Sequence, residues 1–463
     1  MKCYIIFSGV VTILIYLKYS VNGRWPYNDK HRSFLNSQLQ NGLRQEILRR
    51  HEDLIIFYKA LLEEFSIKTS PMDIELDTVN VLDFHIPTEE NVPPGTLGCV
   101  DLLHLTAVDY IGSGFTKLVL KGTILDGRSI ALKYVHSEGN DIKQCVDLHK
   151  DHVGCHRLAT YKLQKEVALL QILRHPGIIK LHGQCYHNTV GPDIRVTAMM
   201  ELGTPIQMIQ LLQAPWEERF KICFELVQLL HYLANSPMGS IALLDFQPRQ
   251  FVLVDGSLKV TDVDDAITKE LTCTQDEDCT LDFPSKTFAL KCSATGTCEG
   301  INEKRNLYNA YRFFFTYLLP HAPPLAVQPL LQDIMNGTGD LRFGINDTLK
   351  SFENVLNLYK SGMDHHNESE YLKDYLRLDG FRIIDNNDHF RCWPSYNHLG
   401  CLLSVHSAEE AAEICSNHTR CQNFVIGQQR TWTGRLLTSF TSGPVKLVPD
   451  VNSQVYVKKN SDS

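Results

Sequence analysis

The sequence lacks several features that would assign it to common classes of protein. Its 45 Lys and Arg are outnumbered by 53 Asp and Glu, the net charge is −8, and no basic stripe indicates nucleic-acid binding. Neither an internal repeat nor a low-complexity segment stands out, so nothing indicates a solenoid or fibrous protein. No CxxC pair occurs among the fourteen cysteines, which argues against a zinc site.

The longest apolar run lies near the N-terminus, from Cys3 to Leu17, between Lys2 and Lys18. It is shorter than the ~20 residues that span a bilayer, but it suits the core of a signal peptide. Small residues at Ser20 and Gly23 offer cleavage sites. We therefore predict a signal peptide over residues 1–23. An uncleaved type II anchor is the alternative and would be the chain's route to membrane contact.

The cysteines and the glycosylation sequons both indicate secretion. Cysteines are dense in two clusters, and such density is typical of compartments where disulfides persist. The clusters are Cys273, Cys279, Cys292 and Cys298, and Cys392, Cys401, Cys415 and Cys421. We expect Cys145 and Cys155 to brace an inserted loop, and Cys223, in an apolar helical pattern, to be a buried free thiol. Sequons occur at Asn336, Asn346, Asn367 and Asn417.

Hydrophobic periodicity divides the chain into segments of different structure. It predicts a long amphipathic helix from His31 to Phe65, packed on the main domain rather than in a coiled coil. It also predicts three strands over 108–135, helices over 158–173, 206–235 and 305–319, and a hairpin at 251–260. The predicted domains are a helical stem (24–98), an N-lobe (99–203), a C-lobe (204–385) and a cysteine-rich extension (386–463).

The first candidate site lies between the first two predicted strands. Gly112 and Gly114 fall in a turn where backbone could close over phosphates without side chains in the way. By themselves, two glycines in such a turn more often reflect the geometry of the turn than phosphate binding. The candidate nucleotide-binding residues are Ile111, Gly112, Ser113, Gly114, Phe115, Thr116, Lys117, Leu118 and Val119.

The residues that follow the turn support its interpretation as a nucleotide-binding loop. Lys133, in the strand pattern Ser-Ile-Ala-Leu-Lys, occupies the position of a lysine that reaches the α- and β-phosphates. Glu166, on the following helix, is placed to pair with it. Each would usually be a solvated surface residue, but together they form a candidate catalytic ion pair.

A second set of candidates flanks the predicted hairpin. Asp245 stands where a catalytic aspartate would accept the substrate hydroxyl, and Gln250 lies five residues later at a metal-binding position. Asp262 follows the hairpin, seventeen residues after Asp245, and would bind Mg²⁺ (or Mn²⁺) together with the β- and γ-phosphates of ATP.

These segments resemble those of eukaryotic-like protein kinases, and more closely those of the vertebrate lonesome kinase family. The resemblance extends from about Leu97 to Lys458 and implies an α+β, two-lobed protein-kinase-like fold with a helical stem and a disulfide-rich C-terminal extension. The matching segments are 112–117, 175–176, 245–251, 259–262, 302–315, 391–396 and 432–435.

Several positions depart from the general kinase pattern. Lys117 replaces the third glycine, Leu243-Leu244 replaces His-Arg before the aspartate, and Gln247 replaces a lysine that contacts the γ-phosphate. Gln250 stands for Asn but keeps an amide oxygen able to bind Mg²⁺. Val263-Asp264 replaces Phe-Gly, and a cysteine cluster stands where Ala-Pro-Glu would close the activation segment.

The resemblance implies ATP-dependent phosphorylation of tyrosine in secretory-pathway and extracellular proteins, residence in the Golgi lumen with release from the cell, and a role in skeletal development and differentiation. Two other functions fit the altered motifs. One is a secreted pseudokinase that acts as a scaffold, although Lys133 and both aspartates are retained. The other is a kinase of the secretory pathway that phosphorylates glycans.

Overall fold

The computed structural model describes residues 29–66, 96–188, 194–361, 371–384, 390–392, 395–397 and 399–459. The predicted signal peptide and Asn367 lie outside these ranges. Within them, no helix combines the length and the apolar character needed to cross a bilayer. The chain forms two compact units, and each is described by itself. The first comprises residues up to 128, 132–165 and 183–199; the second comprises 129–131, 166–182 and 200–463.

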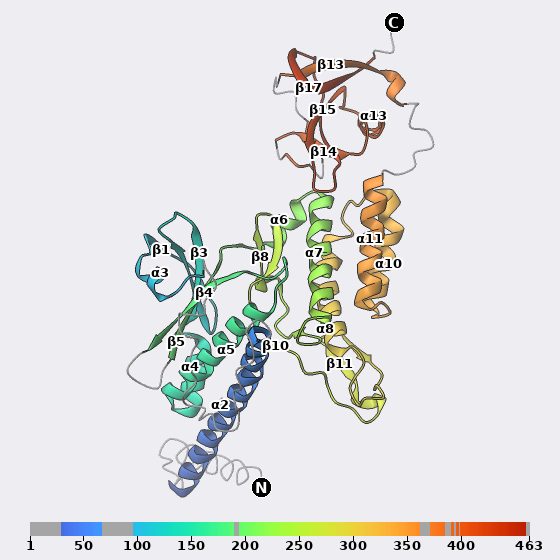
Figure 1. The fold of residues 1–463 in the computed structure, drawn as a ribbon. Helices are drawn as coiled ribbons and strands as arrows, with labels where there is room; N and C mark the ends of the chain where they lie inside the picture. The colour runs from blue at the N-terminus through green and yellow to red at the C-terminus, as the bar shows by residue number, and fades with distance from the viewer. Residues whose placement is uncertain are drawn as a thin grey trace, which may run out of the picture. The chain divides into compact units, whose positions relative to one another are not determined.

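A five-stranded sheet in the order β1-β2-β3-β5-β4 forms the body of the first unit (Figure 1). Its strands are β1 (Ala107–Ser113), β2 (Lys117–Thr123), β3 (Ser129–Val135), β4 (Leu181–Asn188) and β5 (Ile194–Glu201). The three strands predicted over 108–135 are confirmed. Gly127, at φ +85°, closes the turn between β2 and β3, in a backbone conformation that favours glycine.

The helices of the first unit are α2 (Asp29–Ser66), α3 (Cys99–Leu103), α4 (Asn140–His149) and α5 (His152–Ile172), the last of which continues into the second unit. The predicted stem helix is confirmed as α2. It buries Leu43 and Phe57, and the hydroxyl groups of Tyr58 and Tyr186 lie 3.2 Å apart. The helix therefore packs on its own unit and not in a coiled coil, as predicted.

Two disulfides brace the first unit. Cys145–Cys155 joins α4 to α5 and confirms the predicted brace of the inserted loop. Cys99–Cys185 joins α3 to β4 across 86 residues of chain, and the spacing of the cysteines gave no indication of this pair. A bond that closes so long a loop restricts the unfolded chain strongly.

Helices dominate the second unit. They are α6 (Met208–Gln213), α7 (Trp216–Ala234), α8 (Ile301–Ala310), α9 (Thr316–Leu318), α10 (Gln328–Gly339) and α11 (Ile345–Ser361), with a π-helical turn η4 (Tyr311–Phe315) between α8 and α9. Short 3₁₀ turns are η2 (Pro248–Gln250), η3 (Asp276–Asp278), η5 (Leu325–Val327) and η6 (Leu372–Asp374). The α8–α9 segment is buried, with Leu307, Phe314 and Phe315 fully inaccessible, as its almost uniformly apolar sequence predicts.

Among the described residues, the second unit also contains seven short strands outside its C-terminal part. They are β6 (Thr204–Pro205), β7 (Ala242–Leu243), β8 (Phe251–Val254), β9 (Ser257–Val260), β10 (Ala266–Ile267), β11 (Thr280–Phe283) and β12 (Lys286–Ala289). The predicted hairpin is confirmed as β8–β9. Its turn residues Asp255 and Gly256 have φ of +50° and +75°, as expected for the Asp-Gly turn that matches strand twist.

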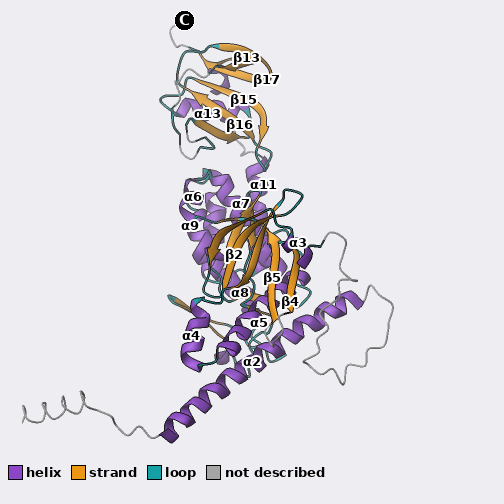
Figure 2. Cartoon of the chain, turned by 90° about the vertical axis from the view of Figure 1, so that its left-hand side faces the viewer, coloured by secondary structure: helices purple, strands orange, loops and turns teal. Residues whose placement is uncertain are grey.

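The last part of the second unit, residues 371–459, is called the C-terminal module. Its sheet runs in the order β13-β17-β15-β16-β14, and α13 packs on that sheet (Figure 2). The elements are β13 (Tyr375–Ile383), β14 (Cys401–Val405), α13 (Ala408–Asn417), β15 (Asn423–Arg430), β16 (Leu436–Thr441) and β17 (Leu447–Lys458). Disulfides Cys392–Cys401 and Cys415–Cys421 select one of the three pairings open to these cysteines.

Buried polar groups join the C-terminal module to the helices. Glu217, at the start of α7 and 2% exposed, accepts hydrogen bonds from the hydroxyls of Tyr359 (3.2 Å), Tyr396 (3.0 Å) and Thr433 (2.6 Å). Burial, reinforced by the Glu217 carboxylate, raises the pKa of both tyrosines, so they remain protonated donors. Two of the three donors, Tyr396 and Thr433, belong to the C-terminal module.

A second junction is formed by Arg435. Its guanidinium pairs with Glu410, donates to the carbonyl of Tyr359 at 3.1 Å and lies 4.3 Å from the centre of the Tyr359 ring. The side chains of Arg435 and Glu410 are only 3% and 14% exposed. The two charges are thus largely shielded from water and pair with each other, although Nε of Arg435 has no hydrogen-bond partner among the described residues.

Replacing Arg435 by Met should therefore destabilise the second unit. The change leaves the Glu410 carboxylate buried without its cation, and the free energy of unfolding should fall by about 3–5 kcal/mol. Urea denaturation would measure the loss. Arg128→Met is the matched control, since its pair with Asp126 is 63% and 48% exposed and should contribute at most about 1 kcal/mol. Equal losses in the two variants would contradict this view of the junction.

Candidate functional site

The glycine turn between β1 and β2 leaves open space above its backbone. Gly112 lies at an irregularity in β1, so the turn itself is confined to Gly114 and the two residues after it, a shorter turn than predicted. A Cβ added to Gly112 would meet nothing within 4 Å, and one added to Gly114 would meet only the Lys117 carbonyl, at 3.7 Å. Neither glycine has a positive φ. Because the chain itself does not require glycine here, the space suits the close approach of a ligand.

The other residues of this turn differ in their surroundings. Ile111 and Phe115 are exposed, at 40% and 57%, while Lys117 is only 5% exposed. Thr116 is also buried, and its hydroxyl donates to Asp141 of α4. Ser113 ends β1, and Leu118 and Val119 are half-buried in β2. The turn therefore exposes the Phe115 ring, while the neighbouring Thr116 connects the turn to α4.

Lys133 and Glu166 are both buried charged residues. Lys133 is 5% exposed in the apolar strand β3, and Glu166 is 1% exposed in α5. Lysine and glutamate are rarely buried without polar partners, and both make such contacts here. Lys133 belongs to the first unit and Glu166 to the second. Such burial is unusual for charged side chains and fits residues that make a specific contact.

In the second unit, backbone pairing brings the segments of both predicted acidic residues together. Asp245 follows β7, whose Leu243 pairs with Ala266 of β10, and Asp262 lies just before β10. The amide of Thr261, next to Asp262, donates to the Gln250 carbonyl at 2.8 Å. Asp245, Gln250 and the chain at Asp262 therefore lie at one end of the β8–β9 hairpin, although seventeen residues separate the aspartates in sequence.

The carboxylate of Asp245 accepts hydrogen bonds from three side chains. Gln247 donates from Nε2 at 2.9 Å, Arg249 donates at 3.1 Å, and Gln250 donates from Nε2. The Gln250 amide uses its nitrogen for this contact and not its oxygen. That oxygen, with a carboxylate oxygen of Asp262, is the type of donor that Mg²⁺ binds. The residues present thus fit a divalent ion bound with triphosphate.

Buried amides on α8 hold the strand that leads to Asp245. Asn306 accepts from the Leu243 amide at 2.9 Å and donates to the Ile241 carbonyl at 2.7 Å. Asn302, one turn earlier, donates to the Ser240 carbonyl at 2.9 Å. Both are at most 2% exposed. The sequence did not single them out, because α8 also contains charged residues and a third asparagine, Asn309.

The segment after Asp262 is held by disulfides. Cys273–Cys292 and Cys279–Cys298 enclose the β11–β12 hairpin, which confirms the predicted cross-linking of this cluster. The sulfurs of Cys273, Cys279 and Cys292 lie within 4.8 Å of one another, but each is committed to a disulfide and not to a metal ion. Cys223 is the predicted free thiol, fully buried, and burial raises its pKa.

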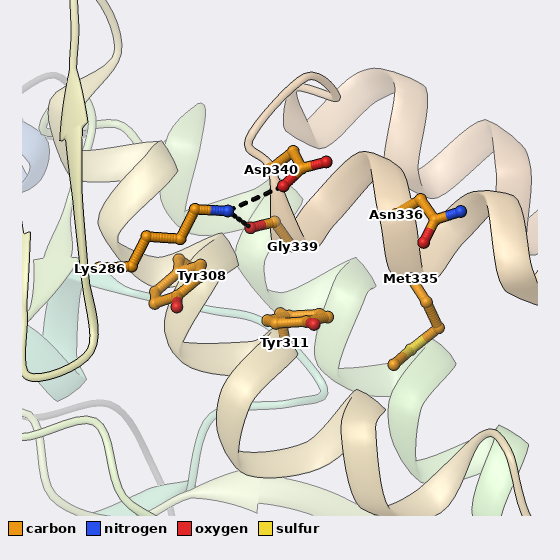
Figure 3. Close-up of a pocket in the computed structure, with 7 residues that line it drawn as sticks. All are labelled: Lys286, Tyr308, Tyr311, Met335, Asn336, Gly339 and Asp340. Carbon is orange, nitrogen blue, oxygen red and sulfur yellow. Dashed lines mark hydrogen bonds and ion pairs between the residues drawn. The ribbon is translucent and has the colours of Figure 1, made fainter.

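The same hairpin is also tied to α10. Lys286 of β12 donates to the Gly339 carbonyl at 2.9 Å and to Asp340 at 2.8 Å (Figure 3). Beside this contact is a small cavity of about 140 Å³, and Asp245, Gln250 and Asp262 are not among its lining residues. It is lined by Lys286, Tyr308, Tyr311, Met335, Asn336, Gly339 and Asp340. The cavity is therefore distinct from the predicted phosphate and metal residues.

The described sequons differ in how open they are. Asn336 and Asn346 lie in α10 and α11, and the threonines two residues later, Thr338 and Thr348, are fully buried with their hydroxyls bonded to backbone carbonyls. Asn417, the last residue of α13, is exposed, and so is its Thr419.

A β-sheet unit and a mainly helical unit of these kinds are the parts of a protein-kinase-like fold. The family model for the protein-kinase domain of FAM69 matches residues 158–337. Human extracellular tyrosine-protein kinase PKDCC is 50% identical over 366 residues, 79% of this chain and 74% of that protein. The chain belongs to this kinase family and has the protein-kinase-like fold.

Two further similarities are weaker. The probable LRR receptor-like serine/threonine-protein kinase RFK1 of Arabidopsis thaliana is 27% identical over 162 residues, which is 33% of this chain and 14% of that protein. A structure of the apo GRMZM2G135359 pseudokinase matches with a TM-score of 0.36 and 14% identity, over 56% of this chain and 96% of the other.

Replacing Asn306 by Leu should disrupt the segment that carries Asp245. The variant leaves the Leu243 amide and the Ile241 carbonyl unpaired in the interior, at about 1–3 kcal/mol each. The urea midpoint should fall accordingly, and amide exchange at Leu243 should accelerate. Asn452→Leu is the control, because its hydrogen bond to Gln428 is exposed and its loss should change stability by about 0.5 kcal/mol or less. Unchanged exchange at Leu243 would disprove the role of Asn306.

Proposed function

We propose that the protein is an ATP- and divalent-metal-dependent tyrosine kinase that acts on proteins of the secretory pathway and the extracellular space. The observation that carries the catalytic part is the arrangement of Asp245, Gln250 and the Asp262 segment around one hairpin end. Membership of a kinase family supports it. Preference for tyrosine is supported by the name of the human relative, as is an extracellular location.

Each candidate residue has a proposed role. The backbone of Ile111–Val119 covers the nucleotide, and Lys133, oriented by Glu166, binds its α- and β-phosphates. Gln250 and Asp262 hold the metal ion. Asp245 would accept the proton of the acceptor hydroxyl as that oxygen bonds to the γ-phosphorus and the bond from this phosphorus to the bridging oxygen of ADP breaks. When bound, Mg–ATP supplies the phosphoryl group, and the metal ion neutralises the charge that develops on the phosphates.

The disulfide-bonded β11–β12 segment suggests constitutive activity. Protein kinases commonly switch by ordering their activation loop through phosphorylation. Here two disulfides and a shared apolar core with Ile301 and Tyr308 hold the corresponding segment in one conformation. We therefore expect activity without prior phosphorylation of this segment.

A phosphotransfer assay tests the catalytic proposal. Secreted full-length protein is incubated with Mg–ATP or Mn–ATP and with tyrosine peptides, serine peptides or glycans. Lys133→Met and Asp245→Ala should each lower the rate at least about 10²-fold, since both remove a group that acts in the transition state. Lys143→Met and Asp147→Ala, which change exposed residues of α4, are the matched controls and should retain full activity.

The outcomes separate the candidate functions. Equal incorporation by the wild type, Lys133→Met and Asp245→Ala would eliminate an intrinsic kinase. Nucleotide binding without transfer to any acceptor would establish the pseudokinase scaffold, and transfer to glycans alone would establish a glycan kinase. A role in skeletal development and differentiation follows from the family resemblance and depends on the same result.

Secretion is tested separately, by mass spectrometry of protein recovered from the medium of mammalian cells. Unreduced peptides should contain the six described disulfides, and Cys223 should react with a thiol reagent only after unfolding. Asn417 should carry glycan at the highest occupancy, because its sequon is exposed in the folded chain. Protein retained in the cytosol with free thiols at Cys273 and Cys279 would refute the proposed location.

A further inference from the structure

The stem helix α2 lies along α5, the helix that carries Glu166 (Figure 1). Near the start of α5, a Cβ added to Gly154 would lie only 3.0 Å from the Leu43 side chain. About two turns further along both helices, the ring centres of His51 and Tyr161 lie 5.7 Å apart. The contacts follow the same order in the two helices, so α2 and α5 run side by side in the same direction.

The contact extends to the residue that precedes Glu166. The ammonium of Lys165 lies 5.5 Å from the centre of the Phe57 ring, within the range of a cation–π interaction. Phe57 is 5% exposed and Lys165 is 9% exposed. Gly154, Tyr161 and Lys165 recur at the spacing of one helix face, and this face of α5 is covered by α2. Because Glu166 follows Lys165 on the same helix, a displacement of α5 displaces Glu166 as well.

The next residue of α2 joins the helix to the sheet of the first unit. The hydroxyls of Tyr58 and Tyr186 lie 3.2 Å apart, and Tyr186 belongs to the edge strand β4. Burial raises the pKa of both tyrosines, so each hydroxyl keeps its proton and can donate to the other. The neighbouring Cys185 is bonded to Cys99 of α3, which holds this part of β4 in place. Consecutive residues of α2 thus connect α5 with the sheet that contains Lys133.

We infer that α2 is a positioning element for catalysis, which holds α5 on the sheet through Phe57 and Tyr58 so that Glu166 can orient Lys133. The inference rests on the proposed kinase function and deepens it. In protein kinases this lysine–glutamate pair must be in place for transfer, and the position of the glutamate helix commonly controls activity. In this chain the stem supplies that control from within the same polypeptide, and Phe57 and Tyr58 act through α5.

The first test compares full-length secreted Phe57→Ala with wild type in the phosphotransfer assay. The kcat should fall about 5- to 30-fold, as expected for a residue that acts through another, and the KM for the acceptor peptide should stay within about twofold. Phe57→Leu keeps an apolar side chain of similar size and should restore most of the rate. Ile56→Ala is the matched control, because Ile56 is adjacent in α2 but 45% exposed, and it should retain full activity.

A double-variant cycle separates positioning from a general loss of stability. If Phe57 acts through Glu166, Phe57→Ala should change kcat by less than about twofold in a chain that already carries Glu166→Gln. Losses that multiply in the double variant would overturn the inference, since Phe57 would then act independently of Glu166. Loss of activity in Ile56→Ala equal to that in Phe57→Ala would overturn it as well.

Chemical labelling of Lys133 provides a readout that does not require transfer to an acceptor. In an acyl phosphate of ATP, a lysine amine beside the phosphates attacks the acyl carbon, forms an amide and displaces ATP. Peptide mass spectrometry should show that Phe57→Ala lowers the labelling of Lys133 by a factor similar to the loss in kcat. The labelling of Lys143, which is exposed on α4, should not change.

Tyr58→Phe gives an independent variant if Phe57→Ala is not secreted. It removes only the hydroxyl contact with Tyr186, and labelling of Lys133 should fall about 2- to 10-fold, the range expected for one hydrogen bond. Unchanged labelling in the variants that are secreted would overturn the role of α2 and leave the kinase function intact. If the wild type transfers no phosphate, the proposed function fails, and the labelling comparison still decides whether α2 positions Lys133.

Discussion

The proposed chemistry of the second unit depends on a buried amide that holds a two-residue strand. Asn306 satisfies the amide of Leu243 and the carbonyl of Ile241, so β7 is held by a buried side chain of α8. Asp245 lies two residues beyond the end of β7. The strand β10 pairs with β7 and so fixes the chain after Asp262. A short strand has little cooperative stability of its own. Its position is therefore set by α8, and through it the positions of both carboxylates.

Disulfides join elements of the fold at several points of the chain. In the first unit, two disulfides tie α3 to β4 and α4 to α5. In the second, two more hold the β11–β12 segment. Each of these disulfides restricts rearrangement of the segments that it joins.

The sequence was most informative where periodicity or turn chemistry is local. The stem helix, the first three strands, the Asp-Gly hairpin and the central apolar helix were all predictable, because each is specified by neighbouring residues. The candidate residues Lys133, Asp245 and Asp262 were proposed from motif order, and their roles stay predictions. Asn306 and the Cys99–Cys185 bond were not predicted, because they depend on contacts between segments far apart in sequence.

The Glu217 cluster changes what counts as the folding unit of this enzyme family member. A boundary drawn after α11 would separate a helical lobe from an accessory tail, yet Tyr396 and Thr433 supply two of the three hydroxyls that hydrogen-bond to a carboxylate inside that lobe. Loss of the C-terminal module would leave Tyr359 as the remaining hydroxyl donor to this carboxylate and expose it to water. The C-terminal module therefore completes the buried contacts of the helical lobe and belongs to the same folding unit.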